Sequence, residues 1–301
     1  MSTLEKVKEL REITGAGMQD CKTALSENNN DIEQAVDFLR KKGILKAAKK
    51  SSRDAAEGLV ATCISNKVGI LIEINSETDF VAKNKEFINF CEEVAKESLK
   101  ANTTDDLKKL EINQNETIEQ AITKLISKIG ENIKIRKFEK IICDGFLAHY
   151  LHNKASDSTG KIGVLLSYNT DNEKIAKELA MNICMHIAAL NPMSIDEKGI
   201  DNNFIENEKK IIIEQLKDDK KPSDILNKII DGKISKIMSE NSLLKQKWVI
   251  DPDVTVEKAI ESFSKSHNIQ FKITNFKRLK VGEGIIINKS NFNEEVKNLT
   301  K

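Results

Sequence analysis

The sequence predicts an α+β protein, and three observations support this class. A strand-strand-helix pattern occurs twice in the middle of the chain. Apolar residues at helical spacing fill residues 3–41, and a charged segment with two apolar arms separates the second repeat from the C-terminal part. Strands that return in hairpins build antiparallel sheets, and helices that lie apart from such sheets define the α+β class.

Residues 1–43 are expected to form a small three-helix bundle. Apolar residues recur at helical spacing in three stretches. These stretches are separated by turns at residues 15–17 and 28–31. Gly43 is expected to end the third helix, because glycine readily adopts the left-handed conformation that often follows a helix. Residues 44–56 then form a partly helical linker.

The duplicated unit consists of two strands joined in a hairpin, followed by a helix. In the first copy the strands begin at Glu57 and Val68, and in the second copy they begin at Asp144 and Ile162. The second copy has about seven extra loop residues at 153–159. Glycines stand at matching places in the two copies, namely Gly58 with Gly145 and Gly69 with Gly163.

Two pseudo-twofold halves, each with its own antiparallel sheet, follow from this duplication. The first half is expected at residues 57–142, and the second at residues 143–200 together with 241–278. Their further elements are a helix over 118–129, a strand over 133–142, a helix over 173–190 and a strand over 269–276.

Residues 201–240 are expected to be inserted into the second half as an antiparallel helical hairpin. The arms carry apolar residues around Ile212 and Ile230 amid many charges. Two helices cannot bury their apolar faces alone, so the hairpin must contact the body or another chain. If the hairpin contacts another chain, two copies of the protein could associate through it, as a homodimer or in a 2:2 complex. Residues 279–301 form a C-terminal module that ends in a helix over 292–301.

Composition argues against several classes of partner. The 48 basic and 47 acidic side chains leave a net charge of +1, which does not suit a protein that binds nucleic acid directly through a broad basic surface. No apolar run reaches the length of a membrane span, and the N-terminus lacks the apolar core of a signal peptide. The five cysteines are scattered and never spaced as C-x-x-C. A cytoplasmic protein with reduced thiols and no membrane contact is expected.

Enzyme chemistry is not visible in the sequence. The chain has neither G-x-x-x-x-G-K-[ST] nor G-x-G-x-x-G, so no phosphate-binding loop is predicted. His149 and His152 stand three apart on a predicted strand and would point to opposite faces, which argues against a metal site. His186 is expected in the core, where it would be hydrogen-bonded. We therefore predict no catalytic residue, no bound metal and no cofactor.

The corner after the strand at residues 69–74 is the most informative segment. Polar residues end the strand, and Thr78, Asp79 and Phe80 follow before a new helical pattern begins after Asn84. One interpretation is structural: Thr78 or Asp79 caps a helical turn, and Phe80 packs into the core. The other is functional: the corner holds a carboxylate and an aromatic ring outward for a partner. The residues alone leave both open.

A family resemblance favours the functional interpretation. Residues 78–83, Thr-Asp-Phe-Val-Ala-Lys, resemble the signature of the elongation factor Ts family. Residues 7–25 are similar to the family's N-terminal signature. Three further segments resemble family segments and occur in family order: Ile-Gly-Glu-Asn-Ile-Lys-Ile-Arg at 129–136, residues 180–189, and Val-Gly-Glu-Gly-Ile at 281–285. The resemblance covers essentially the whole chain.

The resemblance implies a guanine-nucleotide exchange factor that acts by protein binding. Its partner would be elongation factor Tu, in the GDP-bound and nucleotide-free forms, and the bundle would be of the UBA type. Residues at the corner would enter the nucleotide domain and dislodge its Mg²⁺: Thr78, Asp79, Phe80 and Val81. Further partner contacts would be Arg11, Met18, Gln19, His152, Gly282, Glu283 and Gly284. Gln19 stands where the family pattern has a methionine.

Two other functions remain open at this point. The basic stretch at residues 41–53 could contact RNA or the ribosome, although the near-zero net charge argues against this. The N-terminal bundle could also serve a ubiquitin-type or other peptide-binding adaptor.

Overall fold

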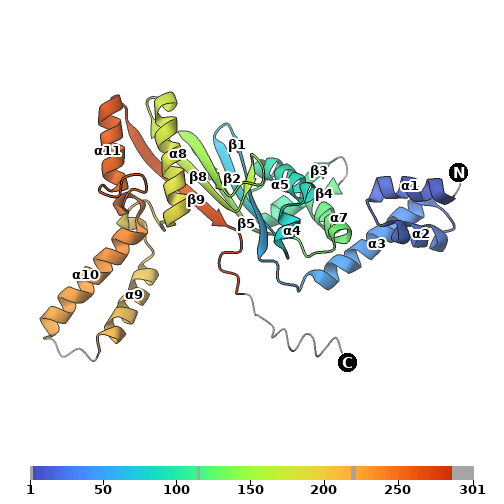
Figure 1. The fold of residues 1–301 in the computed structure, drawn as a ribbon, viewed down its shortest axis with the longest axis horizontal. Coiled ribbons are helices and arrows are strands. Elements are labelled where there is room, and N and C mark those ends of the chain that lie inside the picture. Colours follow the sequence, from blue (N-terminus) through green and yellow to red (C-terminus); the bar gives the residue numbers. More distant parts are fainter. Residues whose placement is uncertain (1–2, 114–115, 218–221, 287–301) are drawn as a thin grey trace.

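The computed structural model describes residues 3–113, 116–217 and 222–286. Two antiparallel sheets face each other at the centre of the molecule, and helices cover the outer side of each (Figure 1). The N-terminal bundle lies at one end of the long axis, and a helical hairpin projects at the other (Figure 1). The α+β class is confirmed.

The bundle consists of α1 (Thr3–Thr14), α2 (Met18–Glu27) and α3 (Ile32–Lys50). Its small core contains Val7, Leu10, Cys21, Ala24, Leu25, Ala35 and Leu39. Asp31 caps α3, because its Oδ1 accepts a hydrogen bond of 2.9 Å from the backbone N–H of Gln34.

The predicted end of the third helix at Gly43 is wrong. Gly43 is buried in the middle of α3 and does not have the positive φ of a glycine that ends a helix. Residues 44–50 continue the helix because they are nearly all good helix formers and because α3 packs on a helix of the first half. Much of the predicted linker at 44–56 is therefore helical.

The first half contains a four-stranded sheet of order β5-β2-β1-β7. A buried cluster between this sheet and its helices forms the core of the half. The elements are β1 (Glu57–Ser65), β2 (Val68–Ser76), α4 (Asp79–Ala82), α5 (Lys85–Glu97), a 3-10 turn (Ser98–Lys100), α6 (Thr104–Lys109), β3 (Glu111–Asn113), β4 (Glu116–Thr117), α7 (Ile118–Ile129) and β5 (Lys134–Ile142).

The second half contains a three-stranded sheet of order β6-β8-β9. Its elements are β6 (Phe146–His152), β7 (Thr159–Gly160), β8 (Ile162–Thr170), α8 (Glu173–Leu190), a 3-10 turn (Glu197–Gly199), α9 (Asn202–Gln215), α10 (Ser223–Asn241), a 3-10 turn (Leu243–Lys245), α11 (Val256–His267) and β9 (Phe271–Lys280). The predicted strand at 269–276 is thus longer, because its pairing with β8 continues to Lys280. The C-terminal module expected from residue 279 begins inside this strand.

The extra loop of the second copy has a structural use. Its end forms β7, which pairs with β1 and so extends the sheet of the first half. Ser156 and Ser158 donate hydrogen bonds to Oε1 of Glu92 on α5, the second at 3.0 Å. The insertion therefore joins the second half to the edge of the first sheet.

The two sheets contact each other through matched glycines. A Cβ atom at Gly69 on β2 would lie 2.7 Å from Cδ1 of Leu165, and one at Gly163 on β8 would lie 3.0 Å from Cδ2 of Leu71. Each glycine thus makes room for a leucine of the opposite sheet. A separate buried cluster fills this interface, with Val60, Leu71, Ile141, Leu165 and Leu279.

The hairpin is formed by α9 and α10, close to the expected residues 201–240. Ile212 and Ile230 are buried, whereas Ile211, Ile213 and Ile225 are exposed. Association of two chains through the hairpin stays a prediction. The helix expected over 292–301 lies outside the described residues.

Candidate partner-binding site

The corner after β2 combines the two interpretations of its sequence. Thr78 caps α4, and its hydroxyl accepts a hydrogen bond of 3.5 Å from the backbone N–H of Val81. The single turn of α4 directs Val81 and Ala82 into the core. Phe80 points the other way and is 79% exposed. The structural interpretation is thus confirmed for the cap on α4. Its prediction that Phe80 packs into the core is wrong.

An aromatic ring as exposed as Phe80 is unusual for a residue fixed on an ordered corner. Apolar rings are normally buried, since their transfer out of water stabilises the fold. The neighbouring Val81 is only 6% exposed and packs into the core of the first half, so it holds the turn in place. The exposed ring of Phe80 is therefore available for contact with another molecule.

Asp79 carries a negative charge beside the exposed ring. The ammonium of Lys83 lies 2.7 Å from Oδ2 of Asp79, and this hydrogen bond lowers the pKa of the Asp79 carboxyl. The ammonium of Lys161 lies 2.8 Å from Oε2 of Glu57, and Glu57 stands opposite Ser76 at the end of β2, so Lys161 lies near the corner. Asp79 is a half-exposed carboxylate, held by a salt bridge that a competing cation could replace.

Lys161 links three predicted site segments, although sequence reasoning did not select it. Its backbone N–H donates to the carbonyl of His152 at 2.9 Å, and its own carbonyl accepts from Val281 at 3.0 Å. His152 is exposed at the end of β6, where Nδ1 lies 3.1 Å from the hydroxyl of Tyr150. The corner, the His152 turn and the C-terminal turn therefore neighbour one another.

The turn at residues 281–284 is anchored by a buried ion pair. Glu73 on β2 is fully buried, and Oε2 lies 2.8 Å from Nη1 of Arg136. Oε1 of Glu73 also accepts a hydrogen bond of 2.8 Å from the backbone N–H of Gly282. A buried carboxylate is stable only with such compensation.

Glu283 is held on both sides of the same turn. Its carbonyl accepts from Arg136, and its carboxylate lies 3.1 Å from Nη1 of Arg278. Gly282 has a φ of +74° and lies so close to Ala56 that a Cβ atom would stand 2.4 Å from its carbonyl oxygen. Gly282 and Glu283 thus fasten the turn, while Gly284 is exposed beside them.

The bundle residues Arg11, Met18 and Gln19 are all exposed around the turn between α1 and α2. The same turn reaches the body, since a Cβ atom at Gly15 would contact Lys128 on α7 at 3.6 Å. Lys128 pairs with Glu86 in the first turn of α5, shortly after the corner. The bundle face and the corner therefore lie on adjoining elements.

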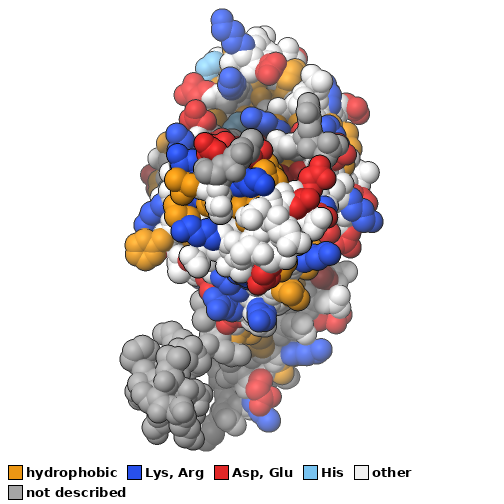
Figure 2. Space-filling model, turned by 90° about the vertical axis from the view of Figure 1, so that its right-hand side faces the viewer, with side chains coloured by type: hydrophobic (Ala, Val, Ile, Leu, Met, Phe, Trp, Pro, Cys, Tyr) orange, Lys and Arg blue, Asp and Glu red, His pale blue; other side chains and the backbone are white. Residues whose placement is uncertain are grey.

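Charges are mixed on the end of the molecule that carries the bundle. Among the described side chains of this face, basic and acidic groups alternate with hydrophobic ones, and neither sign of charge forms a broad surface (Figure 2).

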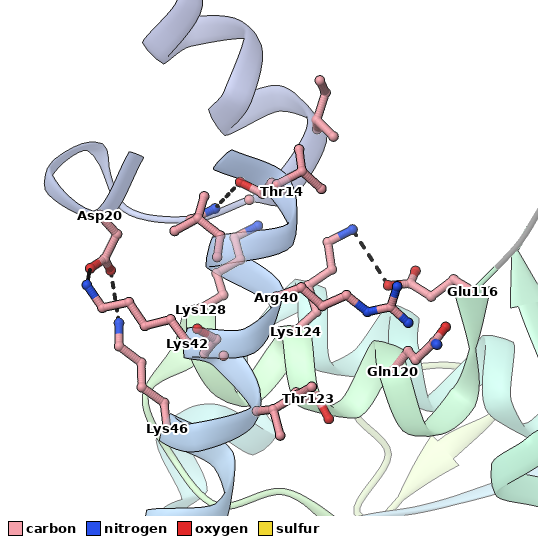
Figure 3. A pocket seen from close by; sticks show the side chains of 18 of the residues that line it. Thr14, Asp20, Arg40, Lys42, Lys46, Glu116, Gln120, Thr123, Lys124 and Lys128 are labelled. Carbon is pink, nitrogen blue, oxygen red and sulfur yellow. Dashed lines mark hydrogen bonds and ion pairs between the residues drawn. The ribbon is translucent and has the colours of Figure 1, made fainter. Parts of the chain in front are cut away.

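A cavity of about 490 Å³ lies between the bundle and α7 (Figure 3). Asp20 binds both Lys42 and Lys46 at its edge, at 3.0 and 2.9 Å. These cations are engaged within the chain.

His186 is a core residue, as predicted. Its ring stacks on Trp248 with centroids 5.2 Å apart, and Nδ1 accepts a hydrogen bond of 3.3 Å from the backbone N–H of Val249. Nε2 therefore carries the proton and donates to Oε1 of Gln246 at 2.9 Å. Burial lowers the pKa of His186, which keeps the ring neutral.

No group of three His, Cys, Asp or Glu side chains within residues 3–113, 116–217 and 222–286 could hold a metal ion. Among the helices of the described part of the chain, none has the length and apolar character that a membrane crossing requires.

Comparison with known proteins assigns both parts of the chain. Residues 1–44 match the family model of the UBA-like domain, and residues 77–283 match the model described as Elongation factor TS. These matches define a translation elongation factor with an N-terminal UBA-like domain.

Whole-chain relatives agree with this class. The chain is 41% identical to elongation factor Ts of Rickettsia massiliae (strain Mtu5) over 298 residues, covering 98% of this chain and 96% of the relative. It is 43% identical to elongation factor Ts of Ruegeria sp. (strain TM1040) over 294 residues, covering 98% of this chain and 97% of the relative. The chain belongs to the elongation factor Ts family.

Proposed function

We propose that this chain is a guanine-nucleotide exchange factor for elongation factor Tu, acting by protein binding and without chemistry of its own. It binds the GDP-bound partner, promotes release of GDP and remains on the nucleotide-free form until GTP enters. Asp79 and Phe80 insert into the nucleotide domain and displace the structure that holds Mg²⁺. Mg²⁺ demands near-ideal octahedral geometry. A small displacement of its ligands therefore weakens the binding of both the ion and the diphosphate to the partner.

The exposure of Phe80 is the observation that carries this proposal. A ring 79% exposed on a capped and anchored corner is suited to enter a pocket, and buried aromatic anchors dominate many protein interfaces. The neighbouring Asp79 carboxylate adds a charge that can compete for cations or N–H donors in the partner. His152 and the turn with Gly284 lie beside this corner and extend the contact surface.

The bundle supplies a second contact area in this proposal. Arg11, Met18 and Gln19 are exposed together, and Met18 is 49% exposed on the first turn of α2. Methionine suits such a surface, because its flexible side chain adapts to the partner. Gly282 and Glu283 act indirectly, since they fix the turn that carries Gly284.

The alternative functions receive less support. In the basic stretch at residues 41–53, Lys42 and Lys46 pair with Asp20, and Lys50 donates to the carbonyl of Gly130. Cations engaged in this way are poor candidates for RNA phosphates. The UBA-like domain alone would suit a peptide adaptor, but it accounts for neither the corner nor the rest of the chain.

The direct test measures release of a fluorescent GDP derivative from purified elongation factor Tu. Addition of this chain is expected to accelerate release, and raised Mg²⁺ is expected to oppose it. Coupling between two ligands of one protein is reciprocal. If this chain weakens the binding of GDP to elongation factor Tu by some factor, GDP must weaken the binding of this chain to elongation factor Tu by the same factor. Unchanged release with a cognate partner would refute the proposal, and calorimetric binding of GDP to this chain itself would contradict a purely protein-binding mechanism.

Removal of residues 1–50 is expected to lower the exchange rate by about tenfold or more, because one contact area is lost. The remaining body should still unfold cooperatively, since the bundle has its own core. A modest fall in Tm is expected, because α3 packs on α7 and Ala47 contacts the core of the first half.

Thermal unfolding and GDP release are measured on the same truncated protein. Loss of the cooperative transition would show that the bundle is part of the body's folding unit. Full activity of a folded truncation would exclude the bundle from the binding surface.

A further inference from the structure

A single carboxylate organises the backbone that leads into the exposed corner. Oε2 of Glu131 accepts hydrogen bonds from the backbone N–H groups of Glu77 and Thr78, at 3.1 and 3.0 Å. Oε1 accepts the hydroxyl proton of Thr78 at 2.6 Å. Glu131 follows Gly130, the residue after α7, and is therefore distant in sequence from the corner it holds.

These hydrogen bonds satisfy groups that no regular element can satisfy. Ser76 ends β2 and Asp79 begins α4, so the N–H groups of Glu77 and Thr78 lie between the ladder of the sheet and the helix. Hydrogen bonds to an ionised acceptor are stronger than those between neutral groups. The carboxylate therefore fixes the two residues that precede Asp79.

Glu131 also determines the direction of the Thr78 hydroxyl. Because the hydroxyl donates its proton to Glu131, its oxygen is free to accept the N–H of Val81 and so caps α4. The cap in turn sets the start of the helical turn on which Val81 points inward and Phe80 outward.

The neighbouring Asn132 reinforces the same segment from the other side. Its backbone N–H donates to Oε1 of Glu77 at 2.6 Å, and its side chain donates to the carbonyl of Arg53 at 2.8 Å. Nη1 of Arg53 lies 3.5 Å from Oε1 of Glu77. The segment before the corner is thus held by Glu131 and Asn132, which follow α7, and by Arg53, which follows α3.

We propose that Glu131 is a positioning residue for nucleotide exchange, which fixes the turn before Asp79 so that Phe80 is presented in one orientation. The inference rests on the proposed role of Phe80. A ring that is already oriented loses less conformational freedom on binding than a ring on a loose turn, so the fixed turn increases the rate of exchange. Glu131 acts through Phe80 and does not itself contact the partner.

The test compares GDP release from elongation factor Tu by Glu131→Ala, Phe80→Ala, the double variant and Lys134→Ala. Lys134 is an exposed residue three positions further along and serves as the matched control, with release expected as in the wild type. Glu131→Ala is expected to slow release by about fivefold or more, the effect of losing charged hydrogen bonds. Glu131→Gln should be intermediate, since one amide oxygen can still accept both N–H groups.

Two readouts distinguish positioning from a general loss of structure. Glu131→Ala should increase hydrogen exchange at the amides of Glu77 and Thr78 by about tenfold or more, while the amides of β2 stay protected. In the Phe80→Ala background the same substitution should have no further effect on release, because it acts only through the ring. If Glu131→Ala fails to fold, Thr78→Val can replace it. This substitution removes the hydroxyl that donates to Glu131, and it is also expected to slow release of GDP.

The outcomes separate this inference from the proposed function. If Phe80→Ala slows release but Glu131→Ala and Thr78→Val do not, the positioning role is overturned and the exchange mechanism stands. Additive effects in the double variant also overturn it, since Glu131 would then act elsewhere. If Phe80→Ala leaves release unchanged, the proposed mechanism fails and the positioning role fails with it.

Discussion

Phe80→Ala is expected to remove most of the exchange activity and to leave the free protein almost as stable as before. Truncation of an anchor residue costs about 2 kcal/mol or more of binding, which corresponds to about a thirtyfold loss. Truncation of an exposed side chain changes the free energy of unfolding by less than about 0.5 kcal/mol. If the ring were a core residue, the cost in stability would instead be roughly 3 to 5 kcal/mol.

The measurement pairs thermal unfolding of the free variant with its rate of GDP release. Ile225→Ala on the hairpin is the matched control, because it truncates another exposed apolar side chain. Both its stability and its exchange rate should remain close to those of the wild type. A large fall in the Tm of Phe80→Ala with exchange intact would return Phe80 to a structural role and refute the mechanism.

Gly163→Val is expected to cause the largest loss of stability, about 3 kcal/mol or more, because it places new atoms inside a closely packed interface. A Cβ atom alone would lie 2.6 Å from Cγ1 of Val60 and 3.0 Å from Cδ2 of Leu71. Relief would require the two sheets to move apart. Denaturant unfolding should show the loss directly.

Gly232→Ala provides the control for this prediction. Gly232 lies within α10, and nothing would stand within 4 Å of a Cβ atom there. Alanine is therefore expected to stabilise the helix by about 0.5 to 1 kcal/mol. Addition of Val60→Ala should rescue part of the Gly163→Val defect, since it removes the nearest methyl group. A Gly163→Val protein with wild-type stability would show that the interface is loose.

Sequence reasoning located the regular elements well where periodicity was strong. The predicted helices over 118–129 and 173–190 have the observed bounds of α7 and α8, and the duplicated hairpins are present. It missed α11, although Val256, Ile260 and Phe263 stand at helical spacing behind a capping Thr255. The sequence therefore carries the signal for this helix.

The site was less predictable because its geometry depends on distant residues. The motif at 78–83 could not tell whether Phe80 points inward or outward, since a capped turn is compatible with both. Its orientation is fixed with the help of Glu131, which is 53 residues away from Thr78 in sequence. Gly43 misled the prediction for a similar reason: helix propensity and packing on α7 outweighed the local signal for a helix end.

The matched glycines give the contact between the sheets the character of an isologous interface, in which each partner offers the same surface to the other. A single strand-strand-helix unit could therefore bury this surface by pairing with its own copy. Covalent connection of the two copies makes the encounter intramolecular and independent of protein concentration. It also frees each copy to specialise: the first bears the aromatic corner, and the second bears the hairpin.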